Sequence, residues 1–216
     1  MNRFEKLKNA NPQEAEALIA EIVGEDLAKK FFIEERAIIE AENAEVGSFI
    51  KYADIEWVVL DKKVDKVLIF AKDRLCDWAF DADNRNNWKE STLREDLNNF
   101  NDDNLHKGFK ELEKINKYDL VEFKRDLTTD DGLTDYGSCF DYISLITCEE
   151  YRKYRKHIPN ASDWWWTLTA DSLAYEHLVR NVYSNGSLNS DNAYDGRYGV
   201  RPLCALIPET KVEVCE

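Results

Sequence analysis

Three consecutive tryptophans open the segment Trp164-Trp165-Trp166-Thr167-Leu168-Thr169 (WWWTLT). Aromatic and β-branched residues in a short run predict a β-strand. Because successive side chains on a strand point to opposite faces, the three indoles cannot all enter one core. The segment therefore predicts a strand that either exposes at least one tryptophan or is covered on both faces by other parts of the chain.

Downstream of this strand, short apolar runs alternate with turns rich in Asn, Ser, Gly and Asp. The segment Ser184–Ser187 (SNGS) predicts a tight hairpin turn in which Asn185 and Gly186 adopt positive φ angles. The segment YGVRPLCALI predicts a final strand, with Pro202 at an edge or a bulge because proline cannot donate to a sheet.

Upstream, two apolar runs, Ile55–Leu60 and Val67–Phe70, predict a β-hairpin with its turn near Lys62 and Lys63. Residues 73–135 are polar and irregular, with short helices, one of them capped by Ser91 or Thr92. A strand over residues 142–146 and a helix over residues 148–156 follow.

The first 46 residues predict helices. Asn11 as N-cap, Pro12 at the first helical position and Glu14 mark a helix start, and Gly24 marks its end. A second helix is expected to carry the apolar residues Leu27, Phe31, Phe32, Ile38 and Ile39. The apolar faces can pack on each other, on the main domain or on a second chain, so a homo-oligomer formed through these helices is an open alternative. Helices followed by strands predict an α+β chain, with a helical segment at 1–46 and an α+β domain at 47–216.

Composition narrows the class of protein. The chain has 216 residues, 44% apolar and 12% aromatic, and a net charge of −14, which indicates a folded protein and disfavours direct binding to nucleic acid or to membranes. With no secretory signal or long apolar run, a cytoplasmic location is expected. Five scattered cysteines, no CxxC pair and three histidines argue against a zinc site and a disulfide framework. No metal or cofactor is expected, with a lectin-type calcium site built from scattered Asp and Asn residues as the open alternative.

Six motifs in a fixed order resemble a known domain family. They are IEWVVL (55–60), W…STLREDLN (88–98), DYISLIT (141–147), WWWTLT (164–169), VYSNGSLN (182–189) and GVRPLCAL (199–206). Across residues 47–208 they are similar to a domain of unknown function common in gut Firmicutes and their phages. The ending of that family resembles the C-type-lectin-like fold of formylglycine-generating enzymes and of the variable proteins of diversity-generating retroelements. Here the usual Leu-Arg after two tryptophans is Trp166-Thr167, which changes what the strand displays, and the usual Pro-Ala is Pro202-Leu203-Cys204.

The resemblance and the composition together suggest a binding surface. Tyrosine gives large contact area, asparagine and serine give adaptable hydrogen bonds, and exposed tryptophan is frequent at interface hot spots. The alternative is that the tryptophans belong to the core and the loop residues are ordinary turn residues. The predicted partner-binding residues are Trp164, Trp165, Trp166, Tyr183, Asn185, Asn189, Asp191, Asn192, Tyr194 and Tyr198.

Other motifs carry weaker predictions. Formylglycine-type oxidation needs a reactive cysteine pair, yet Cys204 and Cys215 lack flanking basic residues. The loop DADNRNN (81–87) departs from the EF-hand pattern. The basic run YRKYRKH (151–157) could bind RNA or phosphate, but cations at a helix C-terminus explain it more simply.

The sequence therefore predicts a non-catalytic recognition module of phage or mobile-element origin that binds a protein partner. Its acidic character suggests a host defence factor as that partner, for example a nucleic-acid-binding protein. The alternatives are a retroelement-diversified receptor-binding protein and a formylglycine-generating-type enzyme. An acidic inhibitor would need clustered carboxylates, for which the candidates are Asp81, Asp83, Asp102, Asp103, Asp130 and Asp131.

Overall fold

The computed structural model describes residues 12–23 and 37–215, and the chain divides into two units, Met1–Ala37 and Ile38–Glu216. Helix α2 (Pro12–Val23) lies in the first unit and begins and ends where Pro12 and Gly24 predict. The predicted cap Asn11, and Leu27, Phe31 and Phe32 of the predicted second helix, lie outside the described residues.

The prediction of a helix through Ile38 and Ile39 is wrong. Both residues lie in strand β1 (Ile38–Glu40), which pairs antiparallel with β14 (Lys211–Cys215), and the short 3₁₀ helix η1 (Ala41–Asn43) follows. β-Branched residues favour strands when a partner strand is present. That partner comes from the other end of the chain, so local periodicity could not reveal it. The second unit accordingly begins at Ile38 rather than near residue 47.

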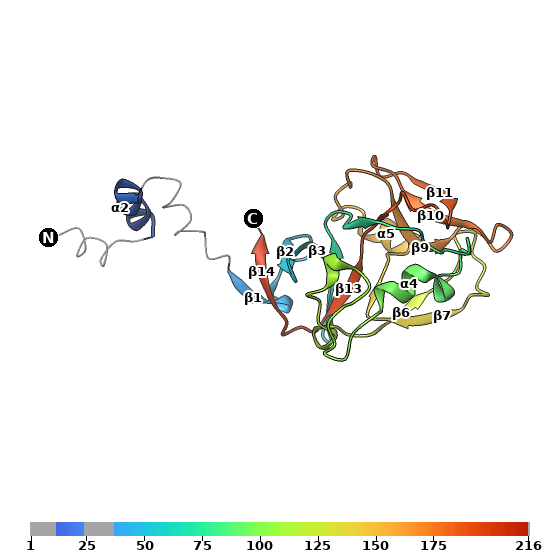
Figure 1. Cartoon of the computed structure of the whole chain (residues 1–216), viewed down its shortest axis with the longest axis horizontal. Coiled ribbons are helices and arrows are strands. Elements are labelled where there is room, and N and C mark those ends of the chain that lie inside the picture. Colours follow the sequence, from blue (N-terminus) through green and yellow to red (C-terminus); the bar gives the residue numbers. More distant parts are fainter. Residues whose placement is uncertain (1–11, 24–36, 216) are drawn as a thin grey trace. The chain divides into compact units, whose positions relative to one another are not determined.

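A seven-stranded sheet forms one layer of the second unit (Figure 1). Its order is β1-β14-β2-β3-β4-β13-β8, and every neighbouring pair is antiparallel. The predicted hairpin is confirmed as β3 and β4, but its turn is Val64-Asp65, two residues beyond the predicted position. The bounds not yet given are β2 (Phe49–Tyr52), β3 (Ile55–Lys63), β4 (Lys66–Ala71), β8 (Ile143–Ser144) and β13 (Leu203–Leu206).

A five-stranded sheet carries the tryptophan segment. Its order is β11-β10-β9-β12-β5, and β12 runs parallel to β9. The predicted final strand is in fact two strands: β12 belongs to this sheet, β13 to the larger one, and Arg201-Pro202 connects them. Strand β14 then follows. The bounds are β5 (Cys76–Asp77), β9 (Trp165–Ala170), β10 (Leu178–Val182), β11 (Leu188–Asn192) and β12 (Gly199–Val200).

The helices of the second unit are short. Helix α4 (Thr92–Leu97) is capped by Ser91, whose Oγ accepts from Arg94 N at 3.2 Å, and α5 (Cys148–Tyr154) begins with a Thr147–Glu150 capping box. The remaining elements are the two-stranded sheet β6 (Phe123–Asp126) and β7 (Ser138–Asp141), and the 3₁₀ helices η2 (Trp88–Glu90), η3 (Lys110–Leu112) and η4 (Lys117–Asp119). The described chain is mostly β-sheet with few helices, which is compatible with the predicted α+β class. None of its helices is long and apolar enough to span a membrane.

Strand β9 is buried on both faces, which answers the question raised by the three tryptophans. Trp165 packs on Phe70 and Tyr151 in one hydrophobic cluster, at ring-centroid distances of 5.5 Å each. Trp166 points the other way, into a second cluster that contains Phe80 and Tyr198. Trp164 precedes the strand and stays 37% exposed. One exposed and two buried indoles therefore result from a sheet with a core on each side.

Candidate functional site

An exposed aromatic pair stands beside the N-terminal end of β9. The ring of Trp164 lies parallel to that of Tyr183, at a centroid distance of 4.6 Å and an interplanar angle of 18°. The buried ring of Tyr198 contacts Trp164 at 5.6 Å. The backbone of Trp164 is held as well, since its carbonyl accepts from Gly199 N at 2.9 Å. The indole is thus supported by residues that adjoin β10 and β12, and it remains partly exposed.

Polar groups surround this pair. Asn189 Nδ2 donates to the Tyr183 hydroxyl, and the Tyr198 hydroxyl donates to Asp191 Oδ2 at 2.6 Å. Burial, together with that hydrogen bond, raises the pKa of Tyr198 above its usual value, so the phenol remains protonated and a donor. Trp164, Tyr183, Asn185, Asn189 and Asp191 are all at least partly exposed, and we call these five residues the aromatic face.

The adjoining hairpin turn holds the aromatic face against helix α5. Gly186 has φ of 84°, a conformation that favours glycine, but Asn185 does not share it, so that part of the turn prediction is wrong. Instead, Asn185 Oδ1 accepts from Ser187 N at 2.9 Å and closes the turn. The Tyr151 hydroxyl donates to the Gly186 carbonyl at 2.8 Å. The turn is therefore tied to the body of the second unit.

Three of the ten predicted partner-binding residues do not reach the surface. Trp165, Trp166 and Tyr198 are at most 1% exposed. The prediction is corrected because β9 lies between two cores, and because Tyr198, next to β12, packs its ring at 4.2 Å on Trp166. These three residues support the aromatic face from below.

Tyr194 and Asn192 lie away from the turn. Strand β11 runs from Leu188, beside the turn, to Asn192, which pairs with Leu178 at the other end of the hairpin. Four steps of about 3.4 Å each separate Leu188 from Asn192 by roughly 14 Å. Tyr194 is 58% exposed, beyond that far end. The structure therefore divides the predicted binding residues between two places.

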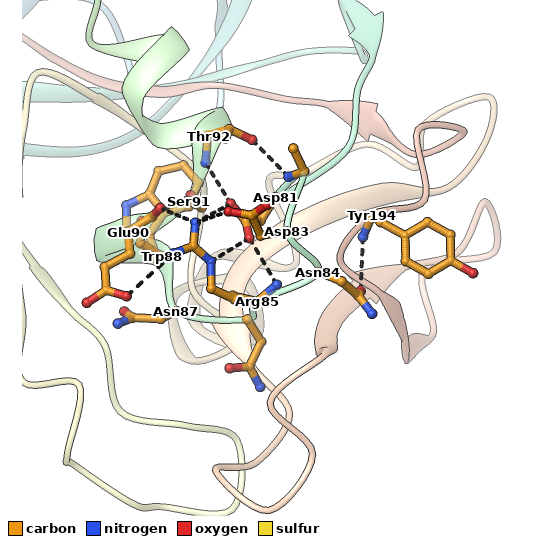
Figure 2. Close-up of polar contacts among 12 residues, drawn as sticks. Asp81, Asp83, Asn84, Arg85, Asn87, Trp88, Glu90, Ser91, Thr92 and Tyr194 are labelled. Atoms are coloured by element: carbon orange, nitrogen blue, oxygen red, sulfur yellow. Dashed lines mark hydrogen bonds and ion pairs between the residues drawn. The ribbon is translucent and has the colours of Figure 1, made fainter.

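A buried carboxylate organises the loop that holds Tyr194 (Figure 2). Asp81 is fully buried and accepts from Arg85 Nε at 2.9 Å and from Thr92 N at 3.1 Å. Asn84, in the same loop, has φ of 61°, and its Oδ1 accepts from Tyr194 N at 3.2 Å. Figure 2 shows the Tyr194 ring turned away from this polar cluster. The loop of residues 81–87, which departs from the EF-hand pattern, is thus held in place by hydrogen bonds.

Asp81 is expected to make stability depend on pH. Burial alone would raise the pKa of its carboxyl, but hydrogen bonds from Arg85 and Thr92 outweigh burial and lower that pKa. The contribution is therefore fully present above the unfolded pKa of about 3.9 and is lost as the pH falls through the lower folded value. Asp81→Asn should lower the free energy of unfolding by about 1–3 kcal/mol at neutral pH, measured by urea denaturation. The difference from the wild type should shrink below about pH 4.

Asp83→Asn is the matched control, since Asp83 lies in the same loop with an exposed side chain. We expect it to change the free energy of unfolding by no more than about 0.5 kcal/mol. Equal losses for the two variants, or a loss for Asp81→Asn that persists unchanged at acidic pH, would contradict this role of Asp81.

The two late cysteines and the basic run of residues 151–157 have defined places in the fold. Cys204 and Cys215 lie on β13 and β14, which are separated in the sheet by β2, β3 and β4, and burial raises the pKa of the Cys204 thiol. In the basic run, Tyr151 and Tyr154 are buried, and Arg152 Nη2 contacts Asp130 Oδ1 at 2.9 Å. Neither motif presents a reactive thiolate or an exposed base-stacking tyrosine.

Sequence reasoning missed one exposed aromatic residue close to Tyr198. Trp78 follows β5 and is 43% exposed. Its backbone N–H donates to Tyr198 O at 3.0 Å, and its backbone carbonyl accepts from Trp166 Nε1 at 2.9 Å. No local signal marks Trp78, because its exposure depends on contacts with strands more than eighty residues away.

The fold and the site together define a sheet-rich protein in which the stacked pair Trp164 and Tyr183 lies at the rim of the five-stranded sheet. Residues 117–208 match a family model described as a domain of unknown function, DUF6273. No curated protein and no solved structure matches the chain. The match runs from η4 to just beyond β13, so it contains the whole aromatic face but not the β2–β4 strands that the sequence resemblance included.

Proposed function

We propose that this chain is a non-catalytic recognition module that binds a protein partner through the aromatic face. The observation that carries the proposal is the supported exposure of Trp164, which stacks on Tyr183 and rests on buried Tyr198. A large aromatic side chain that is already immobile loses little conformational entropy on binding. Asn185, Asn189 and Asp191 add donors and acceptors around it.

The proposal includes a phage or mobile-element origin and a C-type-lectin-like fold, for which the order of the six sequence motifs is the support. A host defence protein is the proposed partner class. Charge mimicry contributes less to the proposal than the aromatic face does, because three of the six candidate carboxylates already pair with arginines, among them Asp83 with Arg85 at 3.2 Å. Asp81 is buried against Arg85, and Asp130 pairs with Arg152 and Arg180.

No specific observation favours either of the two alternative functions. A diversified receptor-binding surface would need its variable loop residues exposed, and Tyr198 of that loop is in the core. An oxidase of the formylglycine-generating type would need an accessible thiolate, and Cys204 is fully buried within β13.

The test is a quantitative comparison of baits. The wild type, Trp164→Ala and Tyr118→Ala are immobilised, and the proteins that each retains from a bacterial host lysate are measured by mass spectrometry. Tyr118 is a matched control, since it is 71% exposed on η4 outside the aromatic face. We expect at least one protein to bind the wild type and Tyr118→Ala but not Trp164→Ala. Calorimetry with that purified protein should show a loss of about 2 kcal/mol, roughly thirty-fold in Kd.

Two results would overturn the proposal. One is that every protein retained by the wild type is retained equally by Trp164→Ala. The other is that no protein is retained above the level of an unrelated acidic bait. If binding is instead lost in the variant Cys204→Ser, the enzyme alternative is favoured.

A further inference from the structure

A cavity of about 670 Å³ lies among β3, β4, β6 and helix α5, and it shares no residue with the aromatic face. Its wall brings together cationic side chains from three distant segments. The β3–β4 hairpin contributes Lys63 and Lys66, β6 contributes Lys124 and Arg125, and α5 contributes Arg152 and Lys153. Six cations face five carboxylates around this cavity, in a chain whose net charge is −14. The wall of this cavity thus has a small excess of positive charge, whereas the whole chain is strongly negative.

The two arginines and Lys153 already have anionic partners. Arg125 binds Glu150 through two hydrogen bonds, of 2.8 and 2.5 Å, and Arg152 pairs with Asp130. Lys153 Nζ lies 3.6 Å from Asp61 Oδ2. These pairs consume three of the five carboxylates, so the arginine and carboxylate groups build the wall and have little capacity for a ligand.

Three lysines are left with surplus positive charge. The ammonium groups of Lys63 and Lys124 make no close ion pair or hydrogen bond with a described residue, although their charges act on Asp61 and Asp126. Lys66 has only the exposed Asp65 nearby, at 3.7 Å. Of the other carboxylates, Asp126 accepts from Thr128 N at 2.9 Å, and Glu149 is solvent-exposed. Lys63 and Lys124 are exposed and Lys66 is half-buried, so a bound anion would be attracted to all three ammonium groups, most strongly at low salt.

The deeper wall offers an apolar surface and an unused donor. Phe123, Cys148 and Thr169 are buried there, and Leu68 lies beside them. The side chain of Arg125 is 3% exposed, yet its Nε has no hydrogen-bond partner among the described residues. A buried donor without an acceptor costs about 1–3 kcal/mol, so a ligand oxygen at this position would be favourable.

We propose that this cavity binds a small organic phosphate. Lysine ammonium groups act as point charges that can approach a tetrahedral phosphate from several directions, whereas planar carboxylates are matched best by the arginine fork, which here is occupied. The phosphate lies among Lys63, Lys66 and Lys124, and the organic part packs against Phe123 and Leu68. The volume falls in the range of small-molecule sites, which favours a free metabolite-sized ligand over a nucleic-acid strand.

The test uses adenosine monophosphate as the probe and uncharged adenosine as its partner. Isothermal titration calorimetry at low salt compares the wild type with the double variant Lys63→Ala/Lys124→Ala. The control is Lys89→Ala/Lys107→Ala, which removes the same charge from exposed positions outside the cavity. We expect the cavity variant to weaken binding of adenosine monophosphate by about ten-fold or more, and the control by less than about two-fold. Added salt should weaken binding to the wild type.

The outcomes separate the possible ligands. Equal affinity of the two double variants, or binding of adenosine as tight as that of its phosphate, overturns the proposal. So does the absence of heat with adenosine monophosphate, pyrophosphate and inorganic phosphate at about 10 mM, a concentration that detects very weak sites. A single-stranded RNA that binds through the same lysines more tightly than any of these probes would replace the small-molecule ligand with nucleic acid. Retention of the protein partner by Lys63→Ala/Lys124→Ala would show that the two sites are independent.

Discussion

Trp166→Ala is expected to lower the free energy of unfolding by about 4 kcal/mol, the range for deleting a large buried aromatic side chain. Trp166 is fully buried and packs on Phe80 and Tyr198. Its Nε1 donates to the Trp78 carbonyl at 2.9 Å. The variant therefore creates a cavity and also leaves a carbonyl without that donor. Urea denaturation followed by circular dichroism measures the loss.

The neighbouring tryptophans supply matched controls of the same residue type. Trp165→Ala should lose packing and one ring face against the Arg201 guanidinium but no indole hydrogen bond, because Trp165 Nε1 has no partner among the described residues, and we expect a loss of about 3 kcal/mol. Trp164→Ala should lose about 1 kcal/mol, the worth of its aromatic contacts at a partly exposed site. Three equal losses would contradict the assignment of two tryptophans to separate cores and one to the surface. The small loss for Trp164→Ala also keeps that variant folded in binding experiments.

Arg201→Ala is the second substitution with a large expected effect. Arg201 is fully buried where the chain passes from β12 to β13. Its guanidinium packs over both rings of the Phe70–Trp165 pair, at 4.5 and 4.7 Å from their centroids. Burial lowers its pKa to about 9, so it is still a cation at neutral pH. No carboxylate pairs with it among the described residues, and the ring faces and carbonyl dipoles stabilise the charge instead.

Three carbonyl oxygens from two separate segments accept from this guanidinium. Arg201 Nη2 donates to Lys72 O at 2.6 Å, Nε to Ala71 O at 3.2 Å and Nη1 to Pro159 O at 3.3 Å. Arg201→Ala removes these donors and leaves a cavity beside the Phe70–Trp165 pair. We expect the free energy of unfolding to fall by about 3–5 kcal/mol. Urea denaturation with tryptophan fluorescence is suitable, because Trp165 reports directly on this contact.

Arg201→Met separates packing from hydrogen bonding. Methionine fills much of the space beside the two rings and removes the cost of burying a charge, but it cannot donate to the three carbonyls. We expect a loss of about 1–2 kcal/mol, smaller than that of Arg201→Ala. If Arg201→Met is as stable as the wild type, the hydrogen bonds contribute no net stability. If Arg201→Ala loses less than about 1 kcal/mol, the role of this junction is wrong.

Local sequence signals were reliable where a few neighbouring residues decide the structure. Ser91 caps α4, and Thr147 opens α5 with its capping box, because these hydrogen bonds span only three residues. The β3–β4 hairpin was predictable for the same reason. Ile38 and Ile39 were placed on a helix because helical spacing was the only local evidence, whereas pairing with β14 requires the far end of the chain.

The candidate site was predictable only in part. The composition of residues 180–198 indicated a binding surface, and Trp164, Tyr183 and Asn185 lie together on it. Composition could not show that Tyr198 is buried by Trp166, or that Tyr194 lies at the opposite end of the hairpin. The lysine cavity gave no sequence signal, since Lys63 and Lys124 are about sixty residues apart and their charges are surrounded along the chain by aspartate and glutamate.

By itself, the sequence determined an α+β chain with short capped helices, a strand at the three tryptophans and an Asn/Gly turn beyond it. These features depend on backbone preference and side-chain alternation over a few residues, so they can be recognised without knowing the fold. Only the tertiary structure decided that Trp165 and Trp166 enter separate cores while Trp164 stays exposed, and that Arg201 joins two sheets. The physical reason is that burial and unpaired charge are properties of surfaces brought together from distant segments, and no local pattern encodes which surfaces will meet.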